Sequence, residues 1–424
     1  MSNLIVGVQF ILLIILGMPV LYLVFLMIAA SFHNRRKNSS KNNVGAAASA
    51  INFVILIPAH NEALTLPTTL QTIKALRYTG NKAEKLSPIV VVIADNCTDN
   101  TAQVAHDAGV IVFERYDKSL LGKGHALNWA IKLLLQQYDQ SQFNALVIFD
   151  ADTVPDKAFL KEAGQALLNG GQVLQGRYDL LNQGQSWRTR LLYSALVLYN
   201  HIRPLGRTVL GLSDGLRGNG MVFRRQVLEQ MPWQAFSLVE DIEYTNRLAL
   251  AGIKVTYVPL ALIYSQAAHT GKQASTQRMR WEGGRIKQAK QDVPDLMRHF
   301  LTKGDWVAFD RAVDLLIPPL TILLFSLFAL TFVNLLDWLW LGGLGLSLTL
   351  AACLFLLVAM VFFVVGGLWI GRCPLSAYTA LLFAPFYMVW KLPLYFKMAL
   401  RRTPQQWIRT SRSKIELNDL NRRG

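Results

Sequence analysis

Cysteine is scarce in this 424-residue chain, and its three copies, Cys97, Cys353 and Cys373, follow no metal-binding spacing. Two of them lie in or beside apolar segments, so the sequence predicts neither a zinc site nor a disulfide framework. The His-Glu-x-x-His and Gly-x-Ser-x-Gly patterns are also missing. Their absence argues against a metalloprotease and an α/β-hydrolase.

Two common phosphate-binding loops are excluded because residues that they require are missing. The stretch Gly122-Lys123-Gly124 lacks the first glycine of a P-loop and the Ser or Thr that follows its lysine. Gly218 and Gly220 are followed by Phe223, where a dinucleotide fingerprint needs a small residue.

Acidic residues are few: 27 Asp and Glu stand against 43 Lys and Arg, a formal net charge of +16. Such a charge predicts an anionic partner, and nucleic acid is one candidate. The basic residues, however, flank apolar segments and fill the C-terminal tail (Arg401, Arg402, Arg409, Arg412, Lys414). That placement favours membrane lipids as the partner, with no nucleic acid.

Residues 1–32 carry no charge and are followed by the basic stretch Arg35-Arg36-Lys37. The segment is long enough to span a bilayer, and we expect an uncleaved anchor rather than a signal peptide. Apolar blocks return at 315–336, 338–370 and 373–390. We therefore predict an anchor (1–34), a flexible linker (37–50), a cytoplasmic domain (51–311), transmembrane or interfacial helices (312–400) and a basic cytoplasmic tail (401–424).

The soluble part alternates short apolar runs with helical stretches, which predicts an α/β fold with a mainly parallel sheet. Strands are expected at 53–57, 89–94, 110–114 and 146–149. Three of these runs end in polar clusters, which are Glu62, Asp95 with Asp99, and Asp150 with Asp152. Ligands bind at the carboxyl ends of parallel strands, so we expect these side chains to share one crevice.

Asp150 and Asp152 directly follow a buried strand, and side-chain alternation predicts that both project to the same side. Two close carboxylates need a positive charge between them, and a hard divalent ion such as Mg²⁺ or Mn²⁺ fits oxygen ligands. The alternative is a turn that carries two solvated aspartates.

Two further clusters follow. Glu240 and Asp241 are expected at the start of a helix. Gln277, Arg280 and Trp281 share one helical face, where an arginine can bind phosphate and a tryptophan can stack on a sugar ring. The competing interpretation is an interfacial amphipathic helix.

In chain order the motifs are Pro58…Glu62, Asp95-x-x-x-Asp99, Gly122-Lys123-Gly124-x-Ala126-Leu127-Asn128, Asp150-x-Asp152, Glu240-Asp241 and Gln277-x-x-Arg280-Trp281. This series resembles the membrane-bound family-2 glycosyltransferases, such as cellulose synthase, hyaluronan synthase, poly-N-acetylglucosamine synthase and ceramide glucosyltransferase. Three positions depart from the usual pattern: Ala94, Cys97 and Val239 stand where many members have aspartate, serine and threonine.

The resemblance implies a GT-A-type nucleotide-sugar-binding domain and a role for each motif. Asp241 would be the catalytic base, and Asp150 and Asp152 would hold the metal. The other residues implied on the donor side are Pro58, Glu62, Asp95, Asp99, Lys123 and Arg280, and those on the acceptor side are Glu240, Gln277 and Trp281. His60 and His125 would be supporting hydrogen-bonding groups.

The expected activity is therefore that of an inverting, metal-dependent hexosyltransferase, which moves a sugar from a UDP-sugar to a growing β-linked polysaccharide. Single-sugar transfer to a membrane lipid is the alternative, and a non-catalytic membrane scaffold is a remote one. The catalytic domain is expected on the cytoplasmic side of the inner (plasma) membrane. The basic tail should also be cytoplasmic, so one of the two proline-bearing apolar blocks should not fully cross.

Overall fold

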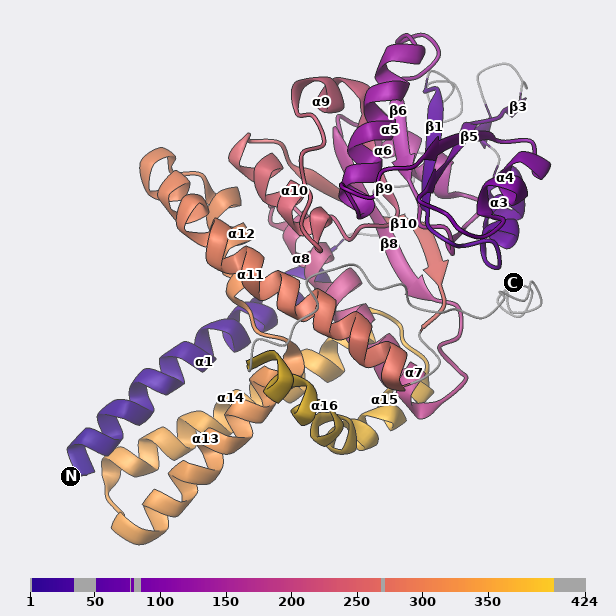
Figure 1. Ribbon diagram of the computed structural model, residues 1–424. Coiled ribbons are helices and arrows are strands. Elements are labelled where there is room, and N and C mark those ends of the chain that lie inside the picture. Colours follow the sequence, from indigo (N-terminus) through magenta and orange to yellow (C-terminus); the bar gives the residue numbers. More distant parts are fainter. Residues whose placement is uncertain (1, 34–50, 77, 80–84, 268–270, 400–424) are drawn as a thin grey trace. The chain divides into compact units, whose positions relative to one another are not determined.

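The computed structural model describes residues 2–33, 51–76, 78–79, 85–267 and 271–399 (Figure 1). The predicted linker (37–50) and basic tail (401–424) lie outside these residues. The chain divides into two compact units. The first, which we call the helical unit, comprises residues 1–33, 186–211 and 313–393; the second, the catalytic unit, holds the motif residues within 34–185 and 212–312.

Long apolar helices make up most of the helical unit. They are α1 (Ser2–Ser31), α13 (Leu320–Leu341) and α14 (Leu344–Ile370), and they run side by side. A shorter series follows, with α15 (Leu375–Ala380), the 3₁₀ turn η3 (Leu381–Phe383) and α16 (Ala384–Ala399). By length and composition, four segments could cross a membrane: Asn3–Ser31, Leu320–Leu341, Leu344–Ile370 and Leu375–Pro393.

Proline sets the boundary of the first C-terminal apolar segment. Helix α12 (Trp306–Leu316) ends before Pro318, and α13 begins only after its N-cap residue, Pro319. A proline lacks a backbone N–H and clashes with the preceding turn, so the helix cannot run through this pair. The apolar helix therefore runs from Leu320 to Leu341, so it begins and ends later than the apolar block at 315–336. The number of full crossings stays a prediction.

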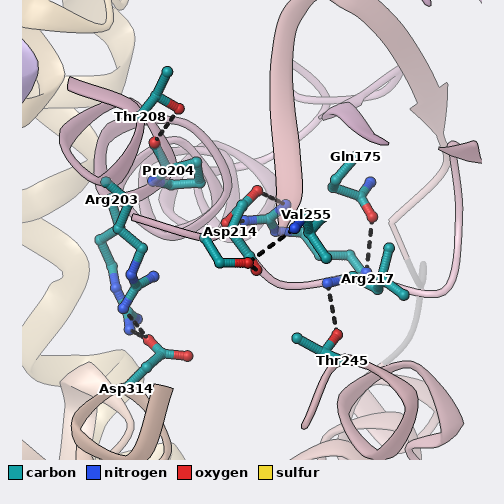
Figure 2. A network of polar contacts seen from close by, with 12 residues as sticks. Gln175, Arg203, Pro204, Thr208, Asp214, Arg217, Thr245, Val255 and Asp314 are labelled. Atoms are coloured by element: carbon teal, nitrogen blue, oxygen red, sulfur yellow. Dashed lines mark hydrogen bonds and ion pairs between the residues drawn. The ribbon is translucent and has the colours of Figure 1, made fainter. Parts of the chain in front are cut away.

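A buried ionic cluster lies inside the helical unit. The segment 186–211 forms α7 (Trp187–Val197), a π-helical turn η2 (Leu198–Ile202) and α8 (Arg203–Val209). Arg203 and Arg207 both donate to Asp314 Oδ1, the second over 2.7 Å. Figure 2 shows the bond between Arg203 and Asp314. Arg207 also donates to the Tyr22 hydroxyl at 3.0 Å. Residues 186–211 were expected within the cytoplasmic domain, whereas here they form one compact unit with the apolar helices.

The catalytic unit is built on an eight-stranded sheet of order β5-β4-β1-β6-β9-β8-β10-β7. Strands β5, β4, β1 and β6 are mutually parallel, β8 is parallel to β10, and the remaining pairs are antiparallel. The strands are β1 (Phe53–Ala59), β4 (Ile89–Asp95), β5 (Ile111–Arg115), β6 (Ala145–Ile148), β7 (Val154–Pro155), β8 (Val173–Leu180), β9 (Met221–Arg224) and β10 (Val255–Ser265). A separate small pair consists of β2 (Tyr78–Thr79) and β3 (Lys85–Leu86). The four expected strands are thereby confirmed.

Both faces of this sheet are covered. Phe53, Ile55 and Ile57 of β1 enter one apolar core, and Val54 and Leu56 enter the other. Because neither face meets water, the central strands are continuous apolar runs without polar alternation. The covering helices are α3 (Leu66–Lys74), α4 (Thr101–Asp107), α5 (Lys123–Gln137), α6 (Phe159–Leu168), α9 (Arg225–Gln230) and α10 (Glu240–Leu250). Helix α11 (Gly271–Lys303) packs on α10 and leads into α12.

Candidate active site

Asp95 is the last residue of β4 and is paired in register with Arg115 at the end of β5. Arg115 Nη1 donates to Asp95 Oδ1 at 2.6 Å, and His60 Nδ1 lies 2.7 Å from the Asp95 carbonyl oxygen. Burial raises the pKa of the Asp95 carboxyl, while the Arg115 guanidinium acts to lower it. The ion pair therefore fixes a carboxylate at the strand end, which suits it to accept a hydrogen bond from a ligand.

The Glu62 and Asp99 side chains brace the loops that follow β1 and β4. Glu62 Oε2 accepts from the Thr65 hydroxyl at 2.8 Å. Asp99 Oδ1 accepts from the Thr101 backbone N–H at 3.0 Å, and its Oδ2 accepts from Ala63 N–H at 3.2 Å. These hydrogen bonds stabilise the conformation of the two loops. Direct contact of Glu62 or Asp99 with a nucleotide-sugar donor stays a prediction. The same holds for Pro58, which lies within β1 opposite Ile93.

Lys123 connects the Asp150 strand end with the start of α10. Its Nζ lies 2.5 Å from both Asp150 Oδ1 and the Gly218 carbonyl oxygen, and 3.8 Å from Glu240 Oε1. Burial acts to lower the pKa of Lys123, but the Asp150 and Glu240 carboxylates outweigh it and the pKa is raised. The side chain is therefore a fixed ammonium at the centre of an acidic cluster.

Asp150 and Asp152 lie just beyond the end of β6, as the sequence predicted. The Asp150 side chain is about one-third exposed, at 35%, and Asp152 is buried. Asn219 holds this turn, because its Oδ1 accepts from Asp150 N–H at 3.2 Å and from the Thr153 hydroxyl at 3.0 Å. Asn219 was not singled out from the sequence as a supporting residue, although it stands between two glycines.

Gly218, one of those two glycines, lies close to two charged side chains of the site. Its φ is +74°, a left-handed conformation that favours glycine, and its carbonyl oxygen bonds Lys123. A Cβ at this position would lie 3.4 Å from Asp241 Oδ2 and 3.6 Å from Lys123 Nζ. The Asp241 carboxylate and the Lys123 ammonium therefore both lie beside the Gly218 backbone.

Glu240 and Asp241 open α10, which confirms the predicted helix start. Burial raises the pKa of Glu240 to about 7 against the opposing charge of Lys123. Burial also raises the pKa of Asp241, while the Ile242 backbone N–H and the nearby cations act in the other direction. A carboxylate with a raised pKa has the character of a general base.

The residues Gln277, Arg280 and Trp281 lie on α11, as expected from their spacing. The Arg280 charge acts on both Glu240 and Asp241, and the Trp281 side chain is exposed. Helix α11 reaches α10 at Gly284, where a Cβ would be 2.8 Å from Val239 Cγ1. Val239, one of the three departures from the usual pattern, therefore supports the packing of the two helices.

The available side chains fit a divalent ion that the substrate helps to hold. Within the described part of the chain, no group of three His, Cys, Asp or Glu residues is placed to form a complete metal site. The Asp150 carboxylate, however, already neutralises a cation, the Lys123 ammonium. Mg²⁺ is commonly bound by one or two carboxylates together with substrate phosphates, and Asp150 and Asp152 match that donor set.

Comparison with known proteins identifies the family. Residues 51–284, more than half of the chain, match the family model described as "Glycosyltransferase like family 2". The chain belongs to this family. Its mostly parallel sheet and covering helices are those of a GT-A-like fold.

Two relatives of this family-2 glycosyltransferase are bacterial. Probable glycosyltransferase YdaM of Bacillus subtilis is 26% identical over 244 residues, which cover 54% of each chain. The poly-β-1,6-N-acetyl-D-glucosamine synthase of Staphylococcus aureus (strain COL) is 24% identical over 244 residues, covering 55% of this chain and 54% of the relative. The match thus spans about half the length of these relatives.

Solved structures share the arrangement more distantly. The mannosyltransferase PcManGT from Pyrobaculum calidifontis, in complex with GDP-Man and Mn²⁺, has a TM-score of 0.48 at 14% identity and covers 83% of this chain and 98% of its own. Glucosyl-3-phosphoglycerate synthase from Mycobacterium tuberculosis, in complex with Mn²⁺, UDP and glucosyl-3-phosphoglycerate, has a TM-score of 0.37 at 20% identity and covers 56% of this chain and 80% of its own. Neither score is high enough to carry a functional argument.

Proposed function

We propose that this family-2 glycosyltransferase inverts the anomeric centre as it transfers a sugar from a UDP-sugar to a growing β-linked polysaccharide at the membrane. The observation that carries the proposal is the meeting of Lys123, Asp150 and Asp241 around the Gly218 backbone. This arrangement puts a cation, a metal-type carboxylate and a candidate base close together. The relationship to a poly-N-acetylglucosamine synthase supports a polysaccharide product.

In the proposed reaction, the acceptor hydroxyl oxygen attacks the anomeric carbon from the side opposite the diphosphate. The new carbon–oxygen bond forms as the bond to the diphosphate breaks, and UDP leaves with that electron pair. Asp241 takes the hydroxyl proton, a role that needs an ionised carboxylate. Lys123 and Arg280 stabilise the negative charge that develops on the diphosphate.

On the donor side, Asp95 would accept a hydrogen bond from the base edge of the uridine. Asp150 and Asp152 would hold Mg²⁺ or Mn²⁺, which supplies Lewis-acid stabilisation of the leaving diphosphate. On the acceptor side, the exposed Trp281 offers a flat apolar surface for a sugar ring. Glu240 and Gln277 lie on the adjoining helices.

The proposed location is the inner (plasma) membrane, with the catalytic unit facing the cytoplasm, where nucleotide sugars are made. The four segments long and apolar enough to cross a membrane support a membrane location. Membrane lipids would surround the outward apolar side chains of these helices, of which Phe328 and Trp340 are examples.

The experiment supplies purified full-length protein in nanodiscs with single UDP-sugars, with and without Mg²⁺ or Mn²⁺, and measures UDP release. Sizing the radiolabelled product then distinguishes a polymer from a lipid that carries one sugar. We expect metal-dependent UDP release and a long product. A single-sugar lipid would replace the polymer proposal with the lipid alternative. UDP release that remains unchanged in Asp241→Asn would contradict the assignment of the base.

A further inference from the structure

Arg311, on α12, was not among the residues picked out from the sequence, yet it lies close to the catalytic carboxylates. Its side chain is buried, at 8% exposure for the residue, and its Nε donates to Asn246 Oδ1 at 2.6 Å. Its Nη1 would be only 3.0 Å from a Cβ at Gly215. The guanidinium is therefore enclosed between α10 and the backbone of the 213–217 segment.

Asn246 anchors that guanidinium in a wider polar network. The residue is almost fully buried and donates through Nδ2 to Asp292 of α11. Asp292 also accepts from Gln288 Nε2 at 2.7 Å. A buried amide that is bonded on both sides has one orientation, so Arg311 Nε is held in a fixed place.

The segment 213–217, on the other side of Arg311, is fastened to the start of α10. Leu216 N–H donates to the Thr245 hydroxyl at 2.9 Å, and that hydroxyl donates to the Asp241 carbonyl oxygen at 2.7 Å. Arg217 N–H donates to Gln175 Oε1 at 2.9 Å, which ties the segment to the sheet. Arg311 thus packs against the segment that is linked, through the Thr245 hydroxyl, to the backbone carbonyl of Asp241.

Asp241 is surrounded by charged groups from four helices: Lys123 of α5, Glu240 of α10 itself, Arg280 of α11 and Arg311 of α12. Lys123 and Arg280 face the proposed donor site, and both would be engaged by the diphosphate. Arg311 is bonded to Asn246 instead, so its charge stays with Asp241 throughout the reaction. Removal of this cation raises the pKa of Asp241, because the Arg311 charge acts to lower it.

We infer that Arg311 is a positioning residue that, through Asn246 and the 213–217 segment, orients Asp241 and keeps it ionised for proton transfer. The inference rests on the proposed function, because it assigns Arg311 to the reaction for which Asp241 is the base. It gives α12 a part in catalysis in addition to its connection to the apolar helices.

The test compares pH–rate profiles of kcat/KM for wild type, Arg311→Met and Arg311→Lys, together with UDP affinity by calorimetry. For Arg311→Met we expect wild-type UDP affinity and an acidic limb of the pH–rate profile that is moved to higher pH. At a fixed pH on that limb the rate should fall on the order of tenfold. Alkaline buffer should restore most of that rate. Arg311→Lys keeps the positive charge but loses the planar guanidinium with its several N–H donors. The acidic limb of its pH–rate profile should therefore stay near that of wild type, while kcat falls.

Arg247→Met is the matched control, since Arg247 lies on the same helix as Asp241 and bonds Gln234 away from the site. A merely structural role would lower thermal stability or kcat in Arg311→Met without moving the limb, and that result would overturn the inference. If Arg311→Met fails to fold, Asn246→Ala takes its place, and its acidic limb should move to higher pH by a smaller amount. An acidic limb that does not move in Asn246→Ala would also overturn the inference. Absence of sugar transfer by the wild type at every pH overturns the proposed function and this inference together, whereas an active wild type with superimposed profiles overturns the inference alone.

Discussion

Replacement of Glu240 by glutamine should change how the stability of the protein depends on pH. In the folded protein, burial raises the pKa of Glu240 to about 7 from an ordinary value of 4.5. The folded state therefore binds a proton that the unfolded chain has already lost. The contribution of Glu240 to the free energy of unfolding is fully present below pH 4.5 and is lost as the pH rises through about 7.

The size of the effect follows from the two pKa values. The difference between about 7 and 4.5 corresponds to about 3 kcal/mol of folding free energy by linkage. Glutamine cannot ionise, so it removes this cost at pH 8 and changes little at pH 4. The attraction of Lys123, which lies 3.8 Å away, is already included in this difference, because it acts to lower the pKa of Glu240 in the folded protein. We therefore expect Glu240→Gln to be more stable than wild type at pH 8, by about 1–3 kcal/mol.

The assay is thermal unfolding of detergent-solubilised protein between pH 4 and pH 8. The difference in melting temperature between Glu240→Gln and wild type should grow as the pH rises. Glu229→Gln serves as the control, because Glu229 is exposed and lies outside the site. Parallel pH dependences for Glu240→Gln and wild type would refute the reasoning, since they would show that Glu240 ionises in the folded protein as it does in the unfolded chain.

Four other substitutions test separate parts of the structure. Asp241→Asn should retain UDP binding but lose transfer by about 10²–10⁴-fold, measured as UDP release, because an amide cannot accept the proton; near wild-type turnover would exclude Asp241 as the base. Asp152→Ala should weaken UDP-sugar binding in the presence of Mn²⁺ in a calorimetric titration; affinity that remains fully metal-dependent would place the ion elsewhere. Trp281→Leu should preserve UDP binding and membrane insertion but abolish elongation, seen by product sizing, and equal product yield would favour the interfacial-helix interpretation. Asp314→Asn should lower the free energy of unfolding by about 3–5 kcal/mol, because it leaves Arg203 and Arg207 buried without their shared carboxylate; an unchanged melting temperature would contradict this.

The parallel half of the sheet could be predicted because its strands are signalled locally. Runs such as 53–57 and 146–149 are continuously apolar and end in polar residues, which is the pattern of strands buried on both faces. The acidic residues at the strand ends followed from the same pattern, since parallel strands bring their carboxyl ends to one edge. The helix start at Glu240 and the helical face of Gln277 and Trp281 were likewise readable from spacing.

Residues whose importance depends on distant partners could not be predicted. Arg115 and Arg311 look like ordinary surface arginines in the sequence, and only the fold brings them to Asp95 and Asn246. The segment 186–211 was expected in the soluble domain because it lies between the N-terminal and C-terminal apolar segments. Its Arg203 and Arg207 are neutralised by Asp314, more than a hundred residues further along, and no local pattern indicates such a pair.

The charge balance of the site links the expected metal requirement to the unusual carboxyl group of Glu240. Four carboxylates (Asp150, Asp152, Glu240, Asp241) stand against three cations (Lys123, Arg280, Arg311) around the proposed reaction space. A UDP-sugar diphosphate adds further negative charge to this largely buried region, and Lys123 is already bonded to Asp150.

Binding of the UDP-sugar is therefore unfavourable unless positive charge enters with the donor or a carboxylate takes up a proton. A divalent ion on Asp150 and Asp152 meets the first condition, and Glu240, with a pKa of about 7, can meet the second at neutral pH. Such protonation would leave Asp241 as the ionised member of the pair, which is the state that proton abstraction requires.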